Sequence, residues 1–182
     1  SLHELLGEWL VDGGCVLIIC NTIARAQAAY SELAESYGDC VELHHAGFVA
    51  WERVEKEDSL RRQLGPDAHR GAGRPKQKIV VATQVAEQSL DIDADALITD
   101  IAPMDLLIQR IGRLHRHARP FSDRPENLRE PQVVIRGLET SSPVPEFESG
   151  AEAIYGRAIL LSTYAVSVSY THLRAHETKA NL

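Results

Sequence analysis

Cysteine is scarce in this chain, and its spacing argues against two kinds of stabilising site. Only three cysteines occur among 182 residues, at positions 15, 20 and 40, and no C-x-x-C pair is present. An odd number of cysteines without paired spacing is atypical of a disulfide framework and of a thiolate zinc site. We therefore expect a protein of a reducing compartment, the cytoplasm.

Long hydrophobic runs and targeting segments are also lacking. The longest aliphatic run, residues 15–20, has six members, whereas a helix needs about 20 apolar residues to cross a bilayer. The sequence shows no signal-peptide pattern, so we expect no membrane partner. Met104 is the only methionine and the chain opens at Ser1, so we expect a piece of a longer protein.

A phosphate-binding loop is a further absence. The chain contains no G-x-x-x-x-G-K-[ST] segment and no Asp-Glu pair, which commonly supply ligands for a triphosphate and its magnesium. We expect that this chain alone lacks most of the groups that bind a nucleoside triphosphate.

The net charge of −7, from 19 basic and 26 acidic residues, excludes a uniformly basic nucleic-acid-binding protein. The charge is uneven, because residues 1–60 carry −8, residues 61–120 carry +3 and residues 121–182 carry −2. Fifteen of the basic residues are arginine, the side chain suited to forked contacts with phosphate. A local basic groove therefore remains open.

Short apolar runs alternate with helical patterns along the chain. These patterns predict strands at residues 15–20, 41–44, 79–83, 96–99 and 133–135, and helices at 2–10, 23–37, 51–64, 103–111 and 151–164. Residues 65–77, rich in Gly, Pro, Arg and Lys, are predicted to form a mobile loop. Alternating strands and helices favour an α/β domain with a parallel sheet and right-handed crossovers.

Two polar residues that come after the apolar run at residues 79–82 are candidate ligand contacts. Thr83 ends the predicted strand, and its hydroxyl and nearby backbone N–H groups could hold a phosphate, while Asp91 could accept hydrogen bonds from a ribose. Ligands of open α/β sheets bind beyond the carboxyl ends of the strands. Either residue alone is more often structural, as a strand end or a turn cap.

Four arginines recur at intervals of three without an acidic residue among them: Arg110, Arg113, Arg116 and Arg119. Such a density of like charge is unfavourable unless an anion is bound, although a solvated basic face is an equally common explanation. Two neighbours favour the anion. Gln109 can orient a water molecule or a phosphate oxygen, and Gly112 permits close backbone approach or an unusual dihedral angle.

Two segments resemble motifs V and VI of superfamily 2 helicases. Residues 109–116 match every specified place of the motif Gln/His-Arg-x-Gly-Arg-x-x-Arg. Together with Ala-Thr-Gln-Val-x-Glu-Gln-Ser-Leu-Asp-Ile-Asp at residues 82–93, they are similar to the CRISPR-associated helicase–nuclease of type I systems. The resemblance covers about residues 11–165 and implies the second RecA-like domain of a two-domain motor, a three-layer α/β domain with a mainly parallel sheet.

The resemblance also implies roles for individual residues. Arg113 and Arg116 would act as arginine fingers on the γ-phosphate of ATP, and Gln109 would touch that phosphate or the attacking water. Asp91 would contact the ribose, and Gly112 belongs to the same nucleotide-binding set. On the DNA side, Thr83 and Gln84 would contact single-stranded DNA.

An upstream segment is similar to the family's Leu-Leu-His-Ser-Arg-Phe stretch and the Asp-Arg that follows it. His45, Phe48 and Arg53 match, and Arg53 would be a further nucleic-acid contact. Ala-Gly at residues 46–47 replaces the usual Ser-Arg, which weakens the expected DNA-backbone contact there.

By the same resemblance, the missing parts lie elsewhere in a parent protein. A first RecA-like domain would bring the phosphate loop and the magnesium ligands for ATP, and the lack of a His-Asp dipeptide implies that the metal-dependent nuclease domain is absent too. Single-stranded DNA and a CRISPR effector complex would be the other partners. We expect ATP-dependent helicase activity in the parent and an inactive isolated chain.

Residues 1–165 are predicted to form the helicase domain and residues 166–182 an irregular tail. The tail resembles translated adaptor sequence, which predicts a non-native origin; a divergent linker toward a further domain is the alternative.

A non-enzymatic interpretation stays open, in which a nucleic-acid- or protein-binding module uses the arginine cluster and residues 65–78 as a basic patch. A nucleotide site predicts instead that Arg113, Arg116 and Asp91 face one side, at the carboxyl edge of the sheet. The histidine pairs at 44–45 and at 115 and 117 are poorly spaced as ligands, so no metal site is expected.

Overall fold

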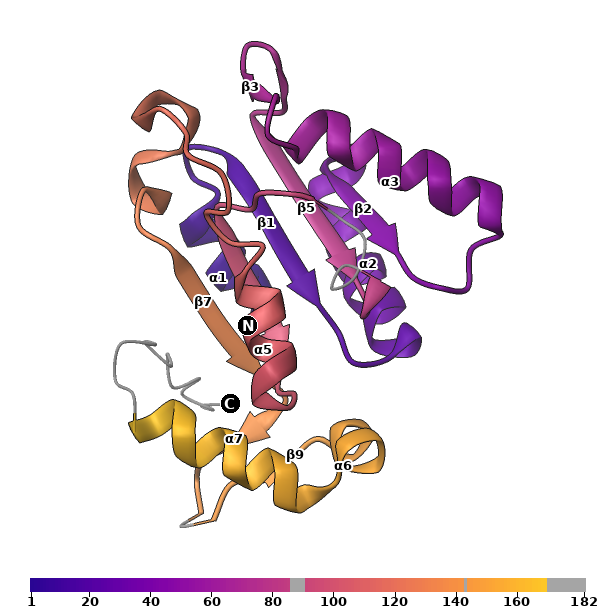
Figure 1. The fold of residues 1–182 in the computed structure, drawn as a ribbon, viewed down its shortest axis with the longest axis vertical. Helices are drawn as coiled ribbons and strands as arrows, with labels where there is room; N and C mark the ends of the chain where they lie inside the picture. The colour runs from indigo at the N-terminus through magenta and orange to yellow at the C-terminus, as the bar shows by residue number, and fades with distance from the viewer. Residues whose placement is uncertain (86–90, 143, 170–182) are drawn as a thin grey trace.

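A parallel five-stranded sheet forms the centre of the computed structural model, which describes residues 1–85, 91–142 and 144–169. The strand order is β2-β5-β1-β6-β7, and every pairing in this sheet is parallel (Figure 1). The strands are β1 (Gly14–Ile19), β2 (Val41–His44), β5 (Gln77–Ala82), β6 (Ala96–Asp100) and β7 (Gln132–Arg136). The α/β domain with a mainly parallel sheet, predicted from the alternating patterns, is confirmed.

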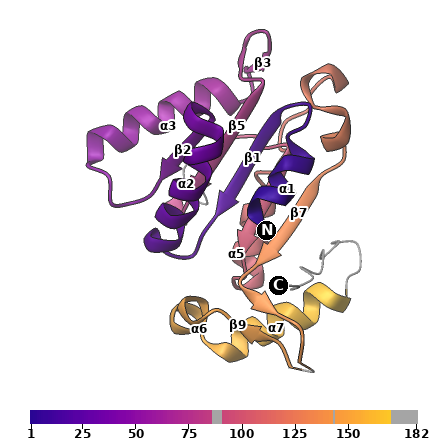
Figure 2. The same ribbon diagram turned by 180° about the vertical axis from the view of Figure 1, so that it is seen from behind.

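Helices cover both faces of this sheet (Figures 1 and 2). Among the described residues, two helices pack on one face and two on the other, so the domain has three layers. The first pair is α1 (Leu2–Trp9) and α2 (Ile23–Tyr37), and the second pair is α3 (Ala50–Leu64) and α5 (Met104–Ile111).

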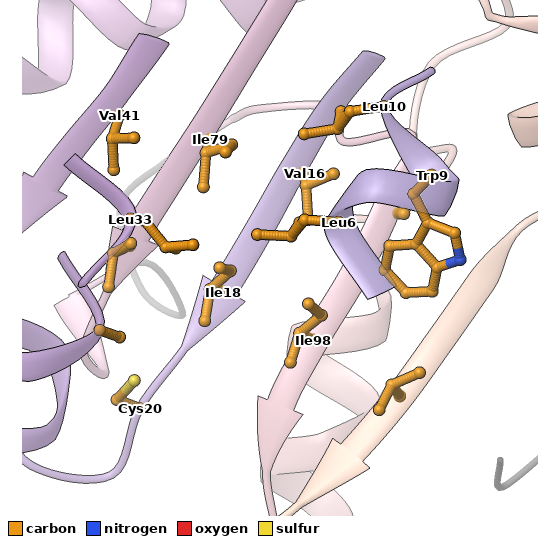
Figure 3. Packing of buried hydrophobic residues seen from close by; sticks show 14 of the residues in the cluster. Leu6, Trp9, Leu10, Val16, Ile18, Cys20, Leu33, Val41, Ile79 and Ile98 are labelled. Atoms are coloured by element: carbon orange, nitrogen blue, oxygen red, sulfur yellow. The ribbon is translucent and has the colours of Figure 1, made fainter. Parts of the chain in front are cut away.

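Side chains of β1 point alternately to the two faces of the sheet, and both faces are covered, so every residue of this strand is buried. Val16 and Ile18 point to the α1 and α2 side, where they pack with Leu6, as Figure 3 shows. Leu17 and Ile19 point to the opposite side, where they pack with the end of α3. A central strand of a parallel sheet is buried on both faces, so it cannot show the apolar–polar alternation of a half-exposed strand.

The C-terminal helix predicted at residues 151–164 is instead two helices, α6 (Ser149–Tyr155) and α7 (Arg157–Ser169). They meet at Gly156, whose φ of 81° lies in the left-handed region that glycine adopts without strain. Helix α7 continues four residues beyond the boundary expected after residue 165, and residues 170–182 of the expected tail lie outside the described residues.

Residues 65–77, predicted to be a mobile loop, contain two short strands, and Arg74 within them is buried. The other short elements are β3 (His69–Arg70), β4 (Gly73–Arg74), β8 (Leu138–Glu139), β9 (Glu146–Phe147), and the 3-10 turns η1 (Gly38–Cys40), η2 (Phe121–Asp123) and η3 (Glu126–Leu128). Among the described residues, no helix has the length and apolar character to span a membrane.

Candidate active site

The carboxyl edge of the sheet holds two of the predicted DNA contacts. Thr83 follows β5, and its backbone N–H donates to the carbonyl oxygen of His44 at 3.1 Å. The Thr83 side chain is buried in this arrangement. Next along the chain, the Gln84 side-chain amide donates to the backbone oxygen of Asn21, which follows β1, at 3.0 Å. Parallel strands end at the same edge, so residues far apart in sequence meet there.

The chain then returns to the amino edge of the sheet before β6 begins. Asp95 exchanges two hydrogen bonds with Cys15, near the start of β1: its N–H donates to the Cys15 oxygen at 2.7 Å, and its carboxylate accepts from the Cys15 N–H at 2.8 Å. Helix α5 also runs back from the carboxyl edge, since it follows β6. The Ala94 N–H donates to the Arg113 oxygen at 2.9 Å, and the His115 N–H donates to the Ala94 oxygen at 3.0 Å.

This pairing brings together the predicted nucleotide-binding residues. The Arg116 Nε donates to the Asp91 carboxylate at 2.6 Å, and His117 Nε2 lies 3.2 Å from the same oxygen. Both partners are accessible, with 40% of the Arg116 side chain and 49% of the Asp91 side chain exposed. The hydrogen bond from Arg116 holds the pKa of Asp91 below its ordinary value.

Arg113 is partly buried beside this pair. Burial lowers the pKa of its guanidinium, the nearby positive charge of Arg116 lowers it further, and Asp91 partly offsets both. Arg116 and Asp91 were predicted to face the same side of the domain, and they are in direct contact. The prediction that they lie at the carboxyl edge is wrong, because Ala94 and Asp95, close behind Asp91, bond to Arg113 and to Cys15 at the start of β1, which is the amino edge.

Two members of the four-arginine cluster are structural. The Arg110 guanidinium is fully buried and donates to the Thr99 hydroxyl at 2.8 Å and to the Asp100 carbonyl oxygen at 3.0 Å. Arg119 is also buried, where it pairs with Asp93 and donates to the Gly65 oxygen at 2.7 Å. The four arginines therefore do not form a basic surface, because Arg110 and Arg119 are buried.

A buried ion-pair network that the sequence did not reveal supports this segment. Arg124 lies 2.5 Å from Asp95 and 2.9 Å from Asp93, and Arg74 lies 2.8 Å from Asp95. Burial alone would raise the pKa of Asp93, but its arginine partners outweigh that and lower it. The sequence feature that could have indicated this network is the alternation of aspartates at residues 91, 93 and 95.

The remaining predicted residues occupy separate positions. Gln109 is exposed on the last turn of α5. Gly112 caps that helix with an ordinary φ of −62°, so no unusual dihedral angle is needed there, although a Cβ would lie 3.3 Å from the Gln109 carbonyl oxygen. Arg53 lies on α3, with its Nε 3.8 Å from Glu57.

The histidines make pairwise contacts. His44 lies 2.8 Å from Glu42, and His115 Nε2 lies 3.1 Å from the Asp95 carbonyl oxygen. In the ranges 1–85, 91–142 and 144–169, no three His, Cys, Asp or Glu side chains gather in a way that could hold a metal ion.

A family model described as "CRISPR-associated nuclease/helicase Cas3, C-terminal" matches residues 12–119. The chain belongs to this Cas3 C-terminal family. The resemblance predicted from motifs V and VI is thereby confirmed, and the chain is a CRISPR helicase C-terminal domain.

Curated Cas3 relatives agree with this assignment. The chain is 42% identical to the CRISPR-associated nuclease/helicase Cas3 of Streptococcus thermophilus over 90% of this chain and 17% of that protein. It is 50% identical to the CRISPR-associated endonuclease/helicase Cas3 of Thermus thermophilus over 75% of this chain and 14% of that protein. The chain therefore spans less than a fifth of the length of these Cas3 relatives.

Solved Cas3 structures share the fold. A crystal structure of T. fusca Cas3 with AMPPNP superposes with a TM-score of 0.82 at 33% identity, covering 92% of this chain and 19% of that chain. The C-terminal domain of the DEAD-box protein Dbp5, at 18% identity and a TM-score of 0.55, covers 96% of this chain and 78% of that chain and shares the fold alone. The predicted RecA-like architecture is thereby confirmed.

Proposed function

We propose that this chain is the second RecA-like domain of an ATP-dependent single-stranded DNA translocase or helicase that acts in CRISPR interference. The observation that carries the proposal is the accessible group formed by Asp91, Arg113 and Arg116. Two guanidiniums and one carboxylate meet there, although 25 positions separate Asp91 from Arg116 along the chain. Crystal structures of T. fusca Cas3 with AMPPNP, ATP and ADP support a nucleotide as the ligand of this group.

The residues fit such a ligand chemically. Guanidinium forks match phosphate oxygens, and a carboxylate can accept hydrogen bonds from ribose hydroxyls. When ATP binds, Arg116 gives up its hydrogen bond to Asp91 and bonds to the γ-phosphate instead. The Asp91 carboxylate then becomes available to the ribose hydroxyls. Arg113 and Arg116 then neutralise the charge that develops on the phosphoryl group, while exposed Gln109 orients that phosphate or the attacking water. Gly112 has no side chain, so it adds no steric bulk to the backbone beside these residues.

The other half of the nucleotide site belongs to the parent protein. We assign the phosphate loop and the magnesium ligands to a first RecA-like domain, because this chain contains no G-x-x-x-x-G-K-[ST] segment. A nuclease domain is a further part of the proposed parent, since curated relatives are named nuclease/helicases. The proposed location is the cytoplasm.

The proposed DNA track runs along the carboxyl edge of the sheet, past Thr83 and Gln84, with Arg53 on α3 as an additional contact. Opening and closing of the cleft between the two RecA-like domains then moves the strand. A chain with 31% identity and a TM-score of 0.76 comes from the structure of a CRISPR RNA-guided surveillance complex in a pre-nicking state, and the match covers 94% of this chain and 21% of that chain. This supports an effector complex as a partner.

The non-enzymatic alternative, a binding module with a basic patch, finds less support. It needs the arginine cluster and residues 65–78 at the surface. Arg110, Arg119 and Arg74 are instead buried, and Arg119 and Arg74 pair with carboxylates.

Replacing each proposed finger by lysine in the complete parent protein tests the proposal. Arg113→Lys and Arg116→Lys should each lower ATP turnover by about 10²-fold or more, because an ammonium cannot copy the planar fork. ATP affinity and nucleotide-free DNA affinity should change little, since the loss occurs in the chemical step. Steady-state hydrolysis and filter binding measure these quantities.

The matched control is Arg129→Lys, at an exposed arginine that pairs with Glu126. It should leave turnover at the wild-type value. Near-normal turnover in both finger variants, or parallel losses of DNA affinity and turnover, would favour the binding-patch alternative.

A further inference from the structure

Asn21 occupies the turn between β1 and α2, where only 3% of the residue is exposed and its backbone and side chain both form hydrogen bonds. Thr22, and not Asn21, caps α2. The Asn21 N–H donates to the Asp100 carboxylate at 3.0 Å, and its side-chain amide donates to the Ile101 carbonyl oxygen at 2.8 Å. These two bonds fix the residue against the end of β6.

The two oxygens of Asn21 contact the two regions assigned to DNA and nucleotide. Its backbone oxygen accepts from the Gln84 side chain at 3.0 Å, and its side-chain oxygen accepts from Arg110 Nη2 at 3.2 Å. Gln84 follows β5, and Arg110 lies in the last turn of α5. A single residue therefore joins the proposed DNA contact to the helix that directly precedes the proposed fingers.

The Arg110 side chain can link the position of Asn21 to that of α5, because several hydrogen bonds hold its guanidinium in place. Its guanidinium is fully buried and also bonds to the Thr99 hydroxyl and the Asp100 oxygen. A buried charge that loses one of its hydrogen bonds is disfavoured, so a shift of Asn21 in the turn after β1 favours a matching shift of Arg110 and of the end of α5. The helix ends at Ile111, directly before Gly112 and the finger segment.

We propose that Asn21 is a positioning residue that couples the binding of single-stranded DNA at Thr83 and Gln84 to the placement of Arg113 and Arg116. This inference rests on the proposed function. It assigns to Asn21 no contact with ATP or DNA, and it predicts an effect on DNA stimulation of hydrolysis that a merely structural residue does not have.

The test is the rate of ATP hydrolysis by the complete parent protein, without DNA and with saturating single-stranded DNA. Asn21→Ala removes the oxygen that Arg110 uses, and should lower DNA-stimulated turnover by about 5- to 30-fold, in the upper part of the range of coupling changes seen along such networks. Turnover without DNA should change by less than about 3-fold. Asn21→Asp keeps an oxygen acceptor for Arg110 but loses the amide that donates to the Ile101 carbonyl oxygen, so it should restore only part of the stimulation.

Tyr155→Phe is the matched control, because the Tyr155 hydroxyl donates to the same Asn21 oxygen from α6 at 3.5 Å. This variant should retain wild-type stimulation. Equal loss of turnover with and without DNA in Asn21→Ala, or full stimulation in that variant, would overturn the inference.

Amide hydrogen exchange of the unmodified parent keeps the inference testable if the variants fail to fold. Binding of single-stranded DNA should change the protection of the α5 amides, whereas unchanged protection would count against the coupling. The finger variants separate this result from the proposed function. If Arg113→Lys abolishes hydrolysis while Asn21→Ala keeps its DNA stimulation, the inference alone fails; if Arg113→Lys hydrolyses ATP normally, the proposed function fails.

Discussion

At the residue scale, burial is the main reason that two of the three cysteines are unreactive. Cys15 lies in β1, where burial raises the pKa of its thiol to about 12. Burial also raises the pKa of the Cys20 thiol to about 11, and the nearby Asp100 carboxylate raises it further. The thiolate is the reactive form of cysteine, so neither residue provides a nucleophile near neutral pH. Cys40 is only partly buried.

Alkylation of the folded chain measures this difference. Iodoacetamide at about pH 8 should modify Cys40 while Cys15 and Cys20 stay unmodified, because both thiols remain protonated and covered. Mass spectrometry of tryptic peptides identifies the modified sites, and the same reaction in urea, where all three cysteines react, is the control. Modification of Cys20 at the rate of Cys40 in the folded chain would contradict the buried placement.

At the scale of elements, the segment after α5 is held by ion pairs more than by secondary structure. Asp93 and Asp95 are fully buried and face Arg124, Arg119 and Arg74. Removing one member leaves a buried charge without its partner, which destabilises a protein more than the pair itself stabilises it. This network also positions the finger segment, since the Arg116 N–H donates to the Asp93 carboxylate at 2.8 Å.

Arg124→Ala should therefore lower the free energy of unfolding of this chain by about 3–5 kcal/mol. Arg129→Ala is the control, because its pair with Glu126 is exposed and contributes less than about 1 kcal/mol. Urea denaturation followed by circular dichroism measures both values. Equal effects of the two substitutions would show that the Arg124 pairs are solvated in the folded chain.

At the scale of the whole molecule, this chain holds only one side of the proposed nucleotide site. Most of the affinity for a triphosphate comes from a phosphate loop and its lysine, and neither is in this sequence. The isolated chain should therefore hydrolyse no ATP above background, with or without single-stranded DNA, and should bind ATP weakly at best. Phosphate release and calorimetry measure these quantities, with the complete parent as the positive control; hydrolysis that survives Arg113→Ala would refute the finger assignment.

Acid should destabilise the whole domain through buried carboxyl groups. Burial alone would raise the pKa of Glu42, but hydrogen bonds from His44 and Lys78 outweigh it and lower the pKa from 4.5 to about 2. The pKa values of Asp93 and Asp100 also lie below the ordinary 3.8, because their partners outweigh the effect of burial. A carboxyl group whose folded-state pKa is depressed stabilises the fold above its unfolded pKa, and this stabilisation is lost as the pH falls.

The free energy of unfolding should therefore be nearly constant from about pH 7 to pH 5 and should decrease from about pH 5 toward pH 2. Urea denaturation at a series of pH values measures this profile. Glu42→Gln should flatten the acidic slope, because one of the depressed carboxyl groups is gone. A wild-type stability that is unchanged at about pH 3 would contradict the depressed pKa values.

Local patterns in the sequence were enough to determine the class of fold. The apolar runs at residues 15–20 and 79–83 became adjacent parallel strands, because a strand buried on both faces needs an unbroken apolar sequence. The match of residues 109–116 to motif VI likewise needed only spacing along the chain. The single helix predicted at residues 151–164 was wrong, because Gly156 adopts a left-handed φ of 81° and separates α6 from α7.

Burial and long-range contacts were decided only by the tertiary structure. Arg110 and Arg116 look equivalent in the sequence, yet one is a fully buried link to Asn21 and the other is an accessible partner of Asp91. Periodicity reports which face of an element is apolar, but an ion pair depends on which segments the crossovers bring together and on how much water they exclude. For that reason the sequence by itself determined the family and the parallel sheet, and folding alone decided which charges support the domain and which remain available to a ligand.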